Sequence, residues 1–219
     1  MYAALFDMDG VLADTEGLIC QATIRMFEEL YGVRMKESDF LQYVGTGAIM
    51  YVEGPASDYG VVIDTDAAIA RRHENFVALL RSGRDIAFPG VRELLCAVRD
   101  NSEWKMALAT STPIETALCT LRAAHIEPEW FDAVMHGGLI ARKKPDPEIF
   151  LAASAACEIP PSRCVVVEDA VTGVAAGKAA GMKVLAVTNT FTREQLAGAD
   201  RFVSSLENVT PGVLESLLT

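Results

Sequence analysis

The sequence contains no long hydrophobic run. Apolar residues never continue for the roughly 18 positions that a membrane-spanning helix requires. The start of the chain also lacks the basic segment and small-residue cleavage site of a secretory signal peptide. We therefore expect a protein with no membrane partner, and the cytoplasm as its compartment.

Positive charge is scarce as well. The chain has 19 Lys and Arg against 30 Asp and Glu, which gives a formal net charge of −11. Nucleic acids and anionic membranes bind basic surfaces, so the charge excludes both as expected partners. A small phosphorylated molecule could still bind, provided that cations are concentrated at its site.

Metal-type cysteine and histidine patterns are absent from the sequence. None of the five cysteines forms a Cys-x-x-Cys or Cys/His motif, and the three histidines share no metal-type spacing. The cysteines are most simply free thiols in a reducing compartment: Cys20, Cys96, Cys119, Cys157 and Cys164.

An acidic motif directly follows the first apolar segment. Residues 3–6 are apolar, and the next ten read Asp7-Met-Asp9-Gly10-Val-Leu-Ala-Asp14-Thr15-Glu16. Side chains two apart on a strand lie on the same side, and two close carboxylates repel unless a cation or a proton intervenes. An ordinary Asp-Gly turn is the alternative. The pattern suits a magnesium site in which one carboxylate attacks and the other moves a proton.

Helical periodicity follows this motif. Apolar residues recur at helical spacing from 18 to 30, and Gly32 ends that pattern. Further helices are predicted from 36 to 82, with breaks at 45–47, Gly54-Pro55 and Gly60, and the last helix runs from about 64 to 80. We predict that residues 15–85 form an all-helical insert.

The remainder alternates between helices and short apolar strands. Strands are predicted at 105–109, 133–135, 164–167, 183–187 and 201–203, and helix caps at Thr112 to Glu115, Asp146-Pro147 and Thr192 to Gln195. This alternation predicts an α/β fold with a doubly wound parallel sheet. The core is discontinuous, formed by residues 1–14 and 86–219.

Ligands of such sheets bind beyond the carboxyl ends of the strands, so polar residues there are candidates for the site. Thr110 and Ser111 follow the second predicted strand, where they could hold phosphate oxygens or simply cap the helix. Lys144 precedes a proline on a stiff loop and would offset negative charge. Glu168 and Asp169 directly follow another strand, which favours cation binding.

Glycines at four-residue spacing follow that acidic pair. Gly173, Gly177 and Gly181 alternate with alanines in a helical segment. Small residues at this spacing make a smooth helix face that approaches a sheet closely. We interpret the segment as packing that fixes the loop of Glu168 and Asp169.

Together, these four motifs resemble those of the haloacid dehalogenase-like (HAD) superfamily, in its beta-phosphoglucomutase-like branch. The resemblance implies a Rossmann-like core with an inserted helical cap domain. It implies Asp7 as nucleophile, Asp9 as general acid and base, and Thr110 and Lys144 as holders of the phosphate. It also implies Mg²⁺ bound by Asp7, the Asp9 backbone carbonyl, Glu168 and Asp169. Ser111 is a substrate-binding candidate from its position beside Thr110.

Among the reactions of this superfamily, we expect hydrolysis of a small phosphorylated metabolite through an aspartyl-phosphate. A beta-phosphoglucomutase-type sugar phosphate mutase is the alternative, but its family pattern has a histidine where this chain has Gly17, Leu18 and Ile19. A non-catalytic domain that binds a phosphorylated ligand is a further alternative. The intact acidic residues and Lys144 argue against that alternative.

The insert is expected to close over the substrate by flexing near residues 14–16 and 83–88. It has eleven acidic against seven basic residues between Glu16 and Asp85, which favours a small monophosphate. The loop of Gly45, Thr46 and Gly47 is expected to select the substrate, unless it is simply a turn. The sequence does not predict the oligomeric state, and a monomer is assumed.

Overall fold

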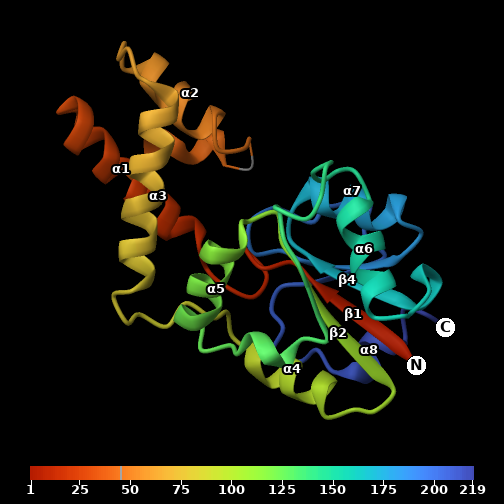
Figure 1. The fold of residues 1–219 in the computed structure, drawn as a ribbon. Coiled ribbons are helices and arrows are strands. Elements are labelled where there is room, and N and C mark those ends of the chain that lie inside the picture. Colours follow the sequence, from red (N-terminus) through yellow and green to blue (C-terminus); the bar gives the residue numbers. More distant parts are fainter. Residues whose placement is uncertain (45) are drawn as a thin grey trace. The chain divides into compact units, whose positions relative to one another are not determined.

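The computed structural model describes residues 1–44 and 46–219. The chain divides into two compact units (Figure 1). We call Met1–Asp14 with Asp85–Thr219 the core unit, and Thr15–Arg84 the helical unit. None of the helices in the described parts of the chain is long and apolar enough to span a membrane.

The core unit contains one parallel sheet in the order β3-β2-β1-β4-β5-β6. The predicted doubly wound parallel sheet is therefore confirmed, and each predicted strand is found to within one residue at either end. The strands are β1 (Tyr2–Phe6), β2 (Trp104–Ala109), β3 (Ala133–Met135), β4 (Cys164–Glu168), β5 (Lys183–Val187) and β6 (Arg201–Val203).

Helices cover both faces of this sheet (Figure 1). On one side α4 contacts α8, and on the other α6 contacts α7. From β1, the chain adds β2 and β3 on one side of the sheet and then β4, β5 and β6 on the other. This change of side creates the crevice where such folds bind ligands. The helical elements are α4 (Val91–Arg99), α5 (Ile114–Ala123), α6 (Glu148–Ala156), α7 (Val171–Ala179) and α8 (Pro211–Glu215), with 3₁₀ turns η2 (Pro128–Trp130) and η3 (Pro161–Arg163).

The central strand β1 is buried on both faces. Residues 3–6 have no exposed surface, and neither do residues 164–167 of the neighbouring β4. This burial explains their continuous apolar sequence, because strands of a parallel sheet covered by helices have no solvent face. Burying a side chain such as Phe6 contributes about 1.5–3 kcal/mol. The first acidic motif thus begins at the end of a rigid element.

The chain after β1 makes a compact turn before it leaves the core unit. The Met8 carbonyl accepts the N–H groups of Leu12 at 2.9 Å and Ala13 at 3.0 Å. The outgoing chain then pairs with the returning chain, since Asp14 N–H donates to the Ile86 carbonyl at 2.7 Å. The chain passes between the units twice, after Asp14 and before Asp85, and both passages therefore adjoin paired segments of the core unit.

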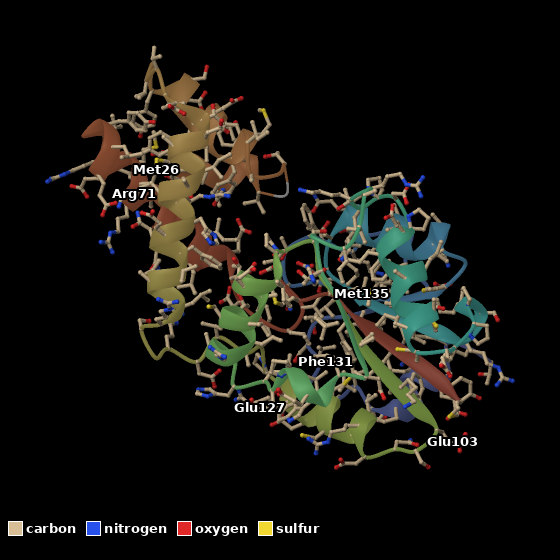
Figure 2. The ribbon with its side chains drawn as sticks, in the orientation of Figure 1. Met26, Arg71, Glu103, Glu127, Phe131 and Met135 are labelled. Atoms are coloured by element: carbon tan, nitrogen blue, oxygen red, sulfur yellow. The ribbon has the colours of Figure 1, made fainter. Side chains whose placement is uncertain are left out.

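The helical unit contains α1 (Glu16–Tyr31), the 3₁₀ helix η1 (Glu37–Tyr43), α2 (Met50–Asp58) and α3 (Thr65–Leu80). Met26 lies in its core, whereas Arg71 on α3 is exposed (Figure 2). The predicted end of the first helix is confirmed, because Gly32 adopts φ 67° and caps α1.

The predicted helix break at Gly54-Pro55 is wrong. Both residues lie within α2, and Pro55 removes one backbone donor without ending the helix. Gly54 has a packing role, because a side chain there would overlap the ring of Tyr43. The glycine therefore brings α2 close to η1 and does not interrupt the helix.

The predicted helix caps were partly wrong. No side-chain cap precedes α5, because Thr112 donates its hydroxyl to Asp9 instead. Thr192 and Gln195 do form reciprocal side-chain bonds, but in a turn that no helix follows. Asp146 does accept the Glu148 N–H at 3.0 Å, at the start of α6.

Candidate active site

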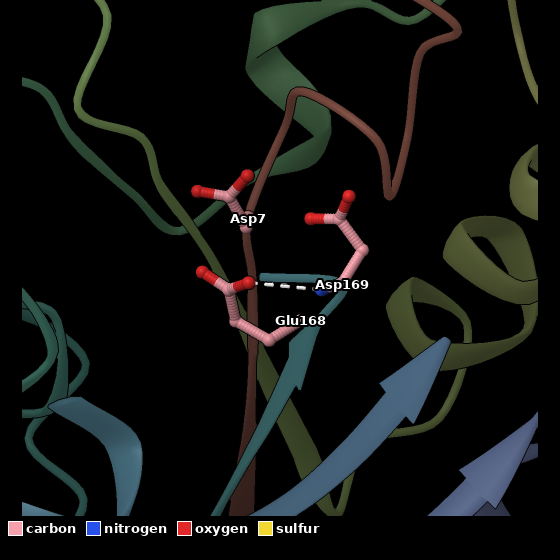
Figure 3. A group of neighbouring side chains, drawn as sticks. All are labelled: Asp7, Glu168 and Asp169. Atoms are coloured by element: carbon pink, nitrogen blue, oxygen red, sulfur yellow. Dashed lines mark hydrogen bonds between the residues drawn. The ribbon is translucent and has the colours of Figure 1, made fainter. Parts of the chain in front are cut away.

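Three carboxylates meet at the ends of two neighbouring strands. Asp7 follows β1, Glu168 ends β4 and Asp169 comes next (Figure 3). Each offers one oxygen, and these oxygens lie within 4.8 Å of one another. All three residues are buried, so their negative charges require a compensating cation.

Lys144 supplies one such cation. Its Nζ lies 2.5 Å from Asp7 Oδ1 and 2.6 Å from Glu168 Oε1. The lysine side chain is only 7% exposed, and its ammonium also lies 4.8 Å above the centre of the Phe150 ring. The Lys144-Pro145 peptide bond is cis. One ammonium against three carboxylates leaves the cluster short of positive charge.

Glu168 is fixed at both of its oxygens. Oε1 accepts the ammonium of Lys144, while Oε2 accepts the N–H groups of Asp169 and Ala170, each at 2.8 Å. Figure 3 shows the bond from Asp169. These contacts join the end of β4 to the loop that leads into α7.

The electrostatics of the cluster follow from burial and charge. Burial raises the pKa of Asp7 to about 7, although Lys144 opposes the shift and Glu168 adds to it. Burial, together with Glu168 and Asp7, also raises the pKa of Asp169. Burial alone would lower the pKa of Lys144, but the two carboxylates raise it above its usual value. Lys144 is therefore a permanent cation at neutral pH.

The loop after β2 contributes hydroxyl groups. Thr110 is 1% exposed, and its Oγ1 accepts the N–H of Thr112 at 3.1 Å. The Thr112 hydroxyl donates to Asp9 Oδ2 at 2.8 Å. Ser111 lies between them and is half-buried. The structure thus brings the second predicted motif against the first.

The sequence analysis missed two polar residues at the end of β5. Asn189 Nδ2 donates to the Gly10 carbonyl at 2.8 Å, and the Thr190 side chain hydrogen-bonds Asp169. The signal was present, because both residues closely follow the predicted strand at 183–187. Thr112 was also missed, since the sequence assigned its hydroxyl to a helix cap.

The residues predicted to select the substrate are not part of this cluster. Thr46 and Gly47 belong to the helical unit, where they lie between η1 and α2. The Thr46 hydroxyl donates to the Tyr43 carbonyl at 2.7 Å, as a turn residue does. Gly45 lies outside the described residues.

The donor set of the cluster fits a hard divalent cation. All of its candidate ligand atoms are carboxylate oxygens, which Mg²⁺ prefers over nitrogen or sulfur. A buried carboxylate that contacts an ammonium also suits transfer of an anionic group. The hydroxyls of the loop after β2 add hydrogen-bond donors for the oxygens of such an anionic group.

Comparison with known proteins identifies the family. Residues 1–181 match the family described as haloacid dehalogenase-like hydrolase. The chain belongs to this family. The family predicted from the four motifs is thereby confirmed.

Two relatives illustrate the similarity. The chain is 39% identical over 201 residues to SUPPRESSOR OF QUENCHING 1, chloroplastic, of Arabidopsis thaliana, and the match covers 90% of this chain. It spans only 19% of the length of that relative. It is also 35% identical to a phosphorylated carbohydrates phosphatase of Thermotoga maritima, covering 84% of this chain and 83% of the relative.

A solved structure shares the complete fold. CbbY from Rhodobacter sphaeroides, in complex with xylulose-(1,5)bisphosphate, superimposes with a TM-score of 0.83 and 28% identity. The alignment covers 98% of this chain and 99% of that one. The similarity therefore includes the helical unit as well as the sheet.

Proposed function

We propose that the protein is a Mg²⁺-dependent phosphomonoester hydrolase that acts through an aspartyl-phosphate on Asp7. The observation that carries the proposal is Lys144, a buried ammonium that contacts both Asp7 and Glu168. Phosphoryl transfer depends mainly on positioning and on neutralising charge. The site supplies a carboxylate for attack and a cation beside it.

In the first step, a carboxylate oxygen of Asp7 attacks the phosphorus and the bond to the ester oxygen breaks. Asp9 starts protonated and gives its proton to the leaving alcohol. In the second step, Asp9 takes a proton from water, whose oxygen attacks the phosphorus. The bond from Asp7 to phosphorus then breaks, which releases inorganic phosphate and regenerates both carboxyl groups.

The chain's own residues would hold the metal and the phosphoryl group. Mg²⁺ would be bound by the carboxylates of the cluster and the Asp9 backbone carbonyl, and when bound it neutralises charge on the transferring group. The hydroxyls of Thr110 and Ser111 and the ammonium of Lys144 would hold the phosphoryl oxygens. The resemblance to the family and the placement of these residues at neighbouring strand ends support the assignment.

The names of two relatives support a proposal for the substrate class. One relative is named as a phosphatase of phosphorylated carbohydrates, and the CbbY structure contains a sugar bisphosphate. We therefore propose a small phosphorylated carbohydrate. The helical unit, residues 15–84, acts as a cap that closes over the substrate, and its loop of Gly45, Thr46 and Gly47 contributes to substrate selection.

The mutase alternative is less well supported. A mutase must retain a bisphosphate, exclude water and return the phosphate to a sugar. The first turn of α1 has Gly17, Leu18 and Ile19 where the mutase pattern places a histidine, and Leu18 is buried in the helical unit. Net hydrolysis is therefore the better proposal. The intact acidic cluster also argues against a non-catalytic binding domain.

The remaining expectations stay predictions. The five cysteines are free, which supports a reducing compartment such as the cytoplasm. The strongly negative charge supports a small-molecule partner over nucleic acid. The oligomeric state stays open, with a monomer assumed.

Release of inorganic phosphate from a panel of phosphomonoesters, with and without Mg²⁺, tests the proposal. The panel includes beta-glucose 1-phosphate, with glucose 6-phosphate followed as a product. Mg²⁺-dependent phosphate release from several esters is expected. Glucose 6-phosphate without free phosphate would identify a mutase, and no turnover with retained ligand binding would identify a binding domain.

Substitution of the proposed nucleophile makes the same assay specific. Asp7→Ala should abolish turnover, because it removes the carboxylate that attacks the phosphorus. Asp9→Asn should slow turnover by about 10² to 10⁴, the usual contribution of a general acid. The exposed Asp14, on the same segment, provides the matched control. Asp14→Ala should turn over at the wild-type rate, and appreciable activity in Asp7→Ala would exclude the aspartyl-phosphate.

A further inference from the structure

Gly173, in the first turn of α7, touches the acidic cluster. A Cβ built at this position would overlap the carboxylate of Glu168, meeting both of its oxygens and the carbon between them. The backbone at Gly173 is ordinary right-handed helix, so its conformation does not require glycine. Alanine would be a better helix former there. The glycine is therefore explained by the space that the carboxylate occupies.

That carboxylate has little freedom to move. Glu168 is 1% exposed, and its two oxygens are held by the Lys144 ammonium at 2.6 Å and by the N–H groups of Asp169 and Ala170 at 2.8 Å. The end of a side chain yields more easily than a helix backbone. An added methyl group would therefore displace the carboxylate and break at least one of these contacts.

We propose that Gly173 is a positioning residue of the metal site. Its missing side chain holds the Glu168 carboxylate between Lys144 and the start of α7, in the place from which the cluster binds a divalent cation. The inference rests on the Mg²⁺ site of the proposed function. It concerns metal binding alone and does not depend on which reaction follows.

Two other glycines have different reasons for lacking a side chain, namely backbone conformation and core packing. A Cβ at Gly10 would overlap the Asp169 carboxylate, but Gly10 also has φ 79°, so a substitution there would strain the backbone as well. Gly177 lies one turn after Gly173 on α7, and a Cβ there would meet side chains of Val184 and Val166 in the core. Gly177 is therefore the matched control for packing.

The experiment compares Gly173→Ala with Gly177→Ala in the full chain without substrate. The unfolding temperature, followed through a Mg²⁺ titration, gives both the stability of the metal-free protein and its affinity for the cation. Gly173→Ala should weaken Mg²⁺ binding about 10- to 100-fold, the usual effect of disturbing a residue that orients a ligand. Gly177→Ala should lower the metal-free unfolding temperature and leave Mg²⁺ affinity unchanged.

A double substitution tests whether the effect passes through Glu168. In Glu168→Ala there is no carboxylate to displace, so adding Gly173→Ala should not lower Mg²⁺ affinity further, and stability should stay the same or rise by the helix preference of alanine. This pair stays informative if Gly173→Ala alone folds poorly, because removing the carboxylate should then restore folding. Wild-type Mg²⁺ affinity in Gly173→Ala, equal losses in both glycine variants, or additive effects in the double variant would each overturn the proposal.

Because no substrate is present, failure of this proposal is distinct from failure of the proposed hydrolysis. If Gly173→Ala binds Mg²⁺ with wild-type affinity and the protein releases phosphate, the positioning role alone is refuted. If Gly173→Ala loses Mg²⁺ affinity as predicted but the wild-type protein turns over no ester, the reaction alone is refuted.

Discussion

At the residue scale, the hydroxyl of Thr112 connects the loop after β2 to the first acidic motif. Thr112 lies just before α5 and donates to Asp9, which is 103 positions away in the chain. The bond fixes one oxygen of the carboxylate that we propose as general acid and base. A proton donor that is free to rotate would spend less time in the productive geometry.

Thr112→Val should therefore lower kcat by about fivefold, because one side-chain hydrogen bond contributes about 1 kcal/mol. The change preserves the shape of the side chain, so KM and the unfolding temperature should change little. Steady-state kinetics of phosphate release measures the effect. Thr112→Ser retains the hydroxyl and should recover most of the rate, whereas a wild-type kcat in the valine variant would refute the positioning role.

Cys157 allows a prediction about pH. Burial raises the pKa of its thiol to about 11, and the residue is 5% exposed. The thiolate is the reactive form, so its population stays low until the pH approaches that value. At pH 8, iodoacetamide should modify the half-buried Cys119 well before Cys157, as measured by mass spectrometry of peptides. Equal modification of both in the folded protein would contradict this expectation.

At the scale of elements, Asp200 connects α7 to the sheet. Its carboxylate accepts the ammonium of Lys178 at 2.7 Å and the N–H of Val184 at 2.8 Å. Burial alone would raise the Asp200 pKa, but Lys178 and the Val184 N–H lower it below its ordinary value. The contact thus stabilises the folded state when the carboxylate is charged.

Asp200→Asn should lower the free energy of unfolding by about 1–2 kcal/mol at pH 7. The folded pKa is depressed, so this stabilisation is present above about pH 4 and is lost as the pH falls through the folded value. Denaturant unfolding at several pH values measures the difference, which should shrink below pH 4. The exposed pair of Arg34 and Glu28 provides the control, and Glu28→Gln should cost less than about 0.5 kcal/mol. A pH-independent difference would contradict the argument.

Prediction from sequence succeeded where one local pattern has one structural meaning. Continuous apolar runs predicted the strands, because buried parallel strands have no polar face. It failed where two structures share a pattern. Thr112 before a proline is typical of a helix cap, yet its hydroxyl contacts Asp9 instead. Gly54 is typical of a break, yet it serves close packing.

Parts of the site depend on contacts that no local pattern contains. Asn189 reaches the Gly10 carbonyl across 179 positions of sequence. The placement of Lys144 was predicted from motif order, but its simultaneous contact with Asp7 and Glu168 required the fold. Sequence reasoning found the candidate residues at the ends of β1, β2 and β4, but not Asn189 and Thr190 after β5. It did not find the hydrogen bonds that orient them.

At the scale of the whole molecule, the outgoing and the returning chain are paired with each other where they leave the core unit. Phe88 N–H donates to the Leu12 carbonyl at 3.2 Å, and Asp14 pairs with Ile86, so the chain on this side belongs to the core unit. Gly83 lies just before the return, with φ 82° and no atom within 4 Å of a potential side chain. If the helical unit closes as proposed, the change in backbone is expected near Gly83, and residues 86–88 stay paired.

Gly83→Ala tests this expectation. The left-handed backbone costs a residue with a side chain about 1 kcal/mol, so a hinge that uses it should change kcat and KM together, by about fivefold. Gly60 also has a positive φ, at 65°, and open space around it, but it lies within the helical unit. Gly60→Ala should lower stability similarly and leave the kinetics unchanged. Identical kinetic effects in both variants would place the hinge elsewhere.

The position of β1 in the sheet also determines when the protein can fold during synthesis. This strand is made before the other strands of the sheet, and its neighbours β2 and β4 begin only at Trp104 and Cys164. The helical unit, by contrast, is one continuous segment from Thr15 to Arg84 and needs no later part of the chain. As the chain leaves the ribosome, the helical unit can therefore form early, while the strand before Asp7 must wait unpaired at least until β2 has been made.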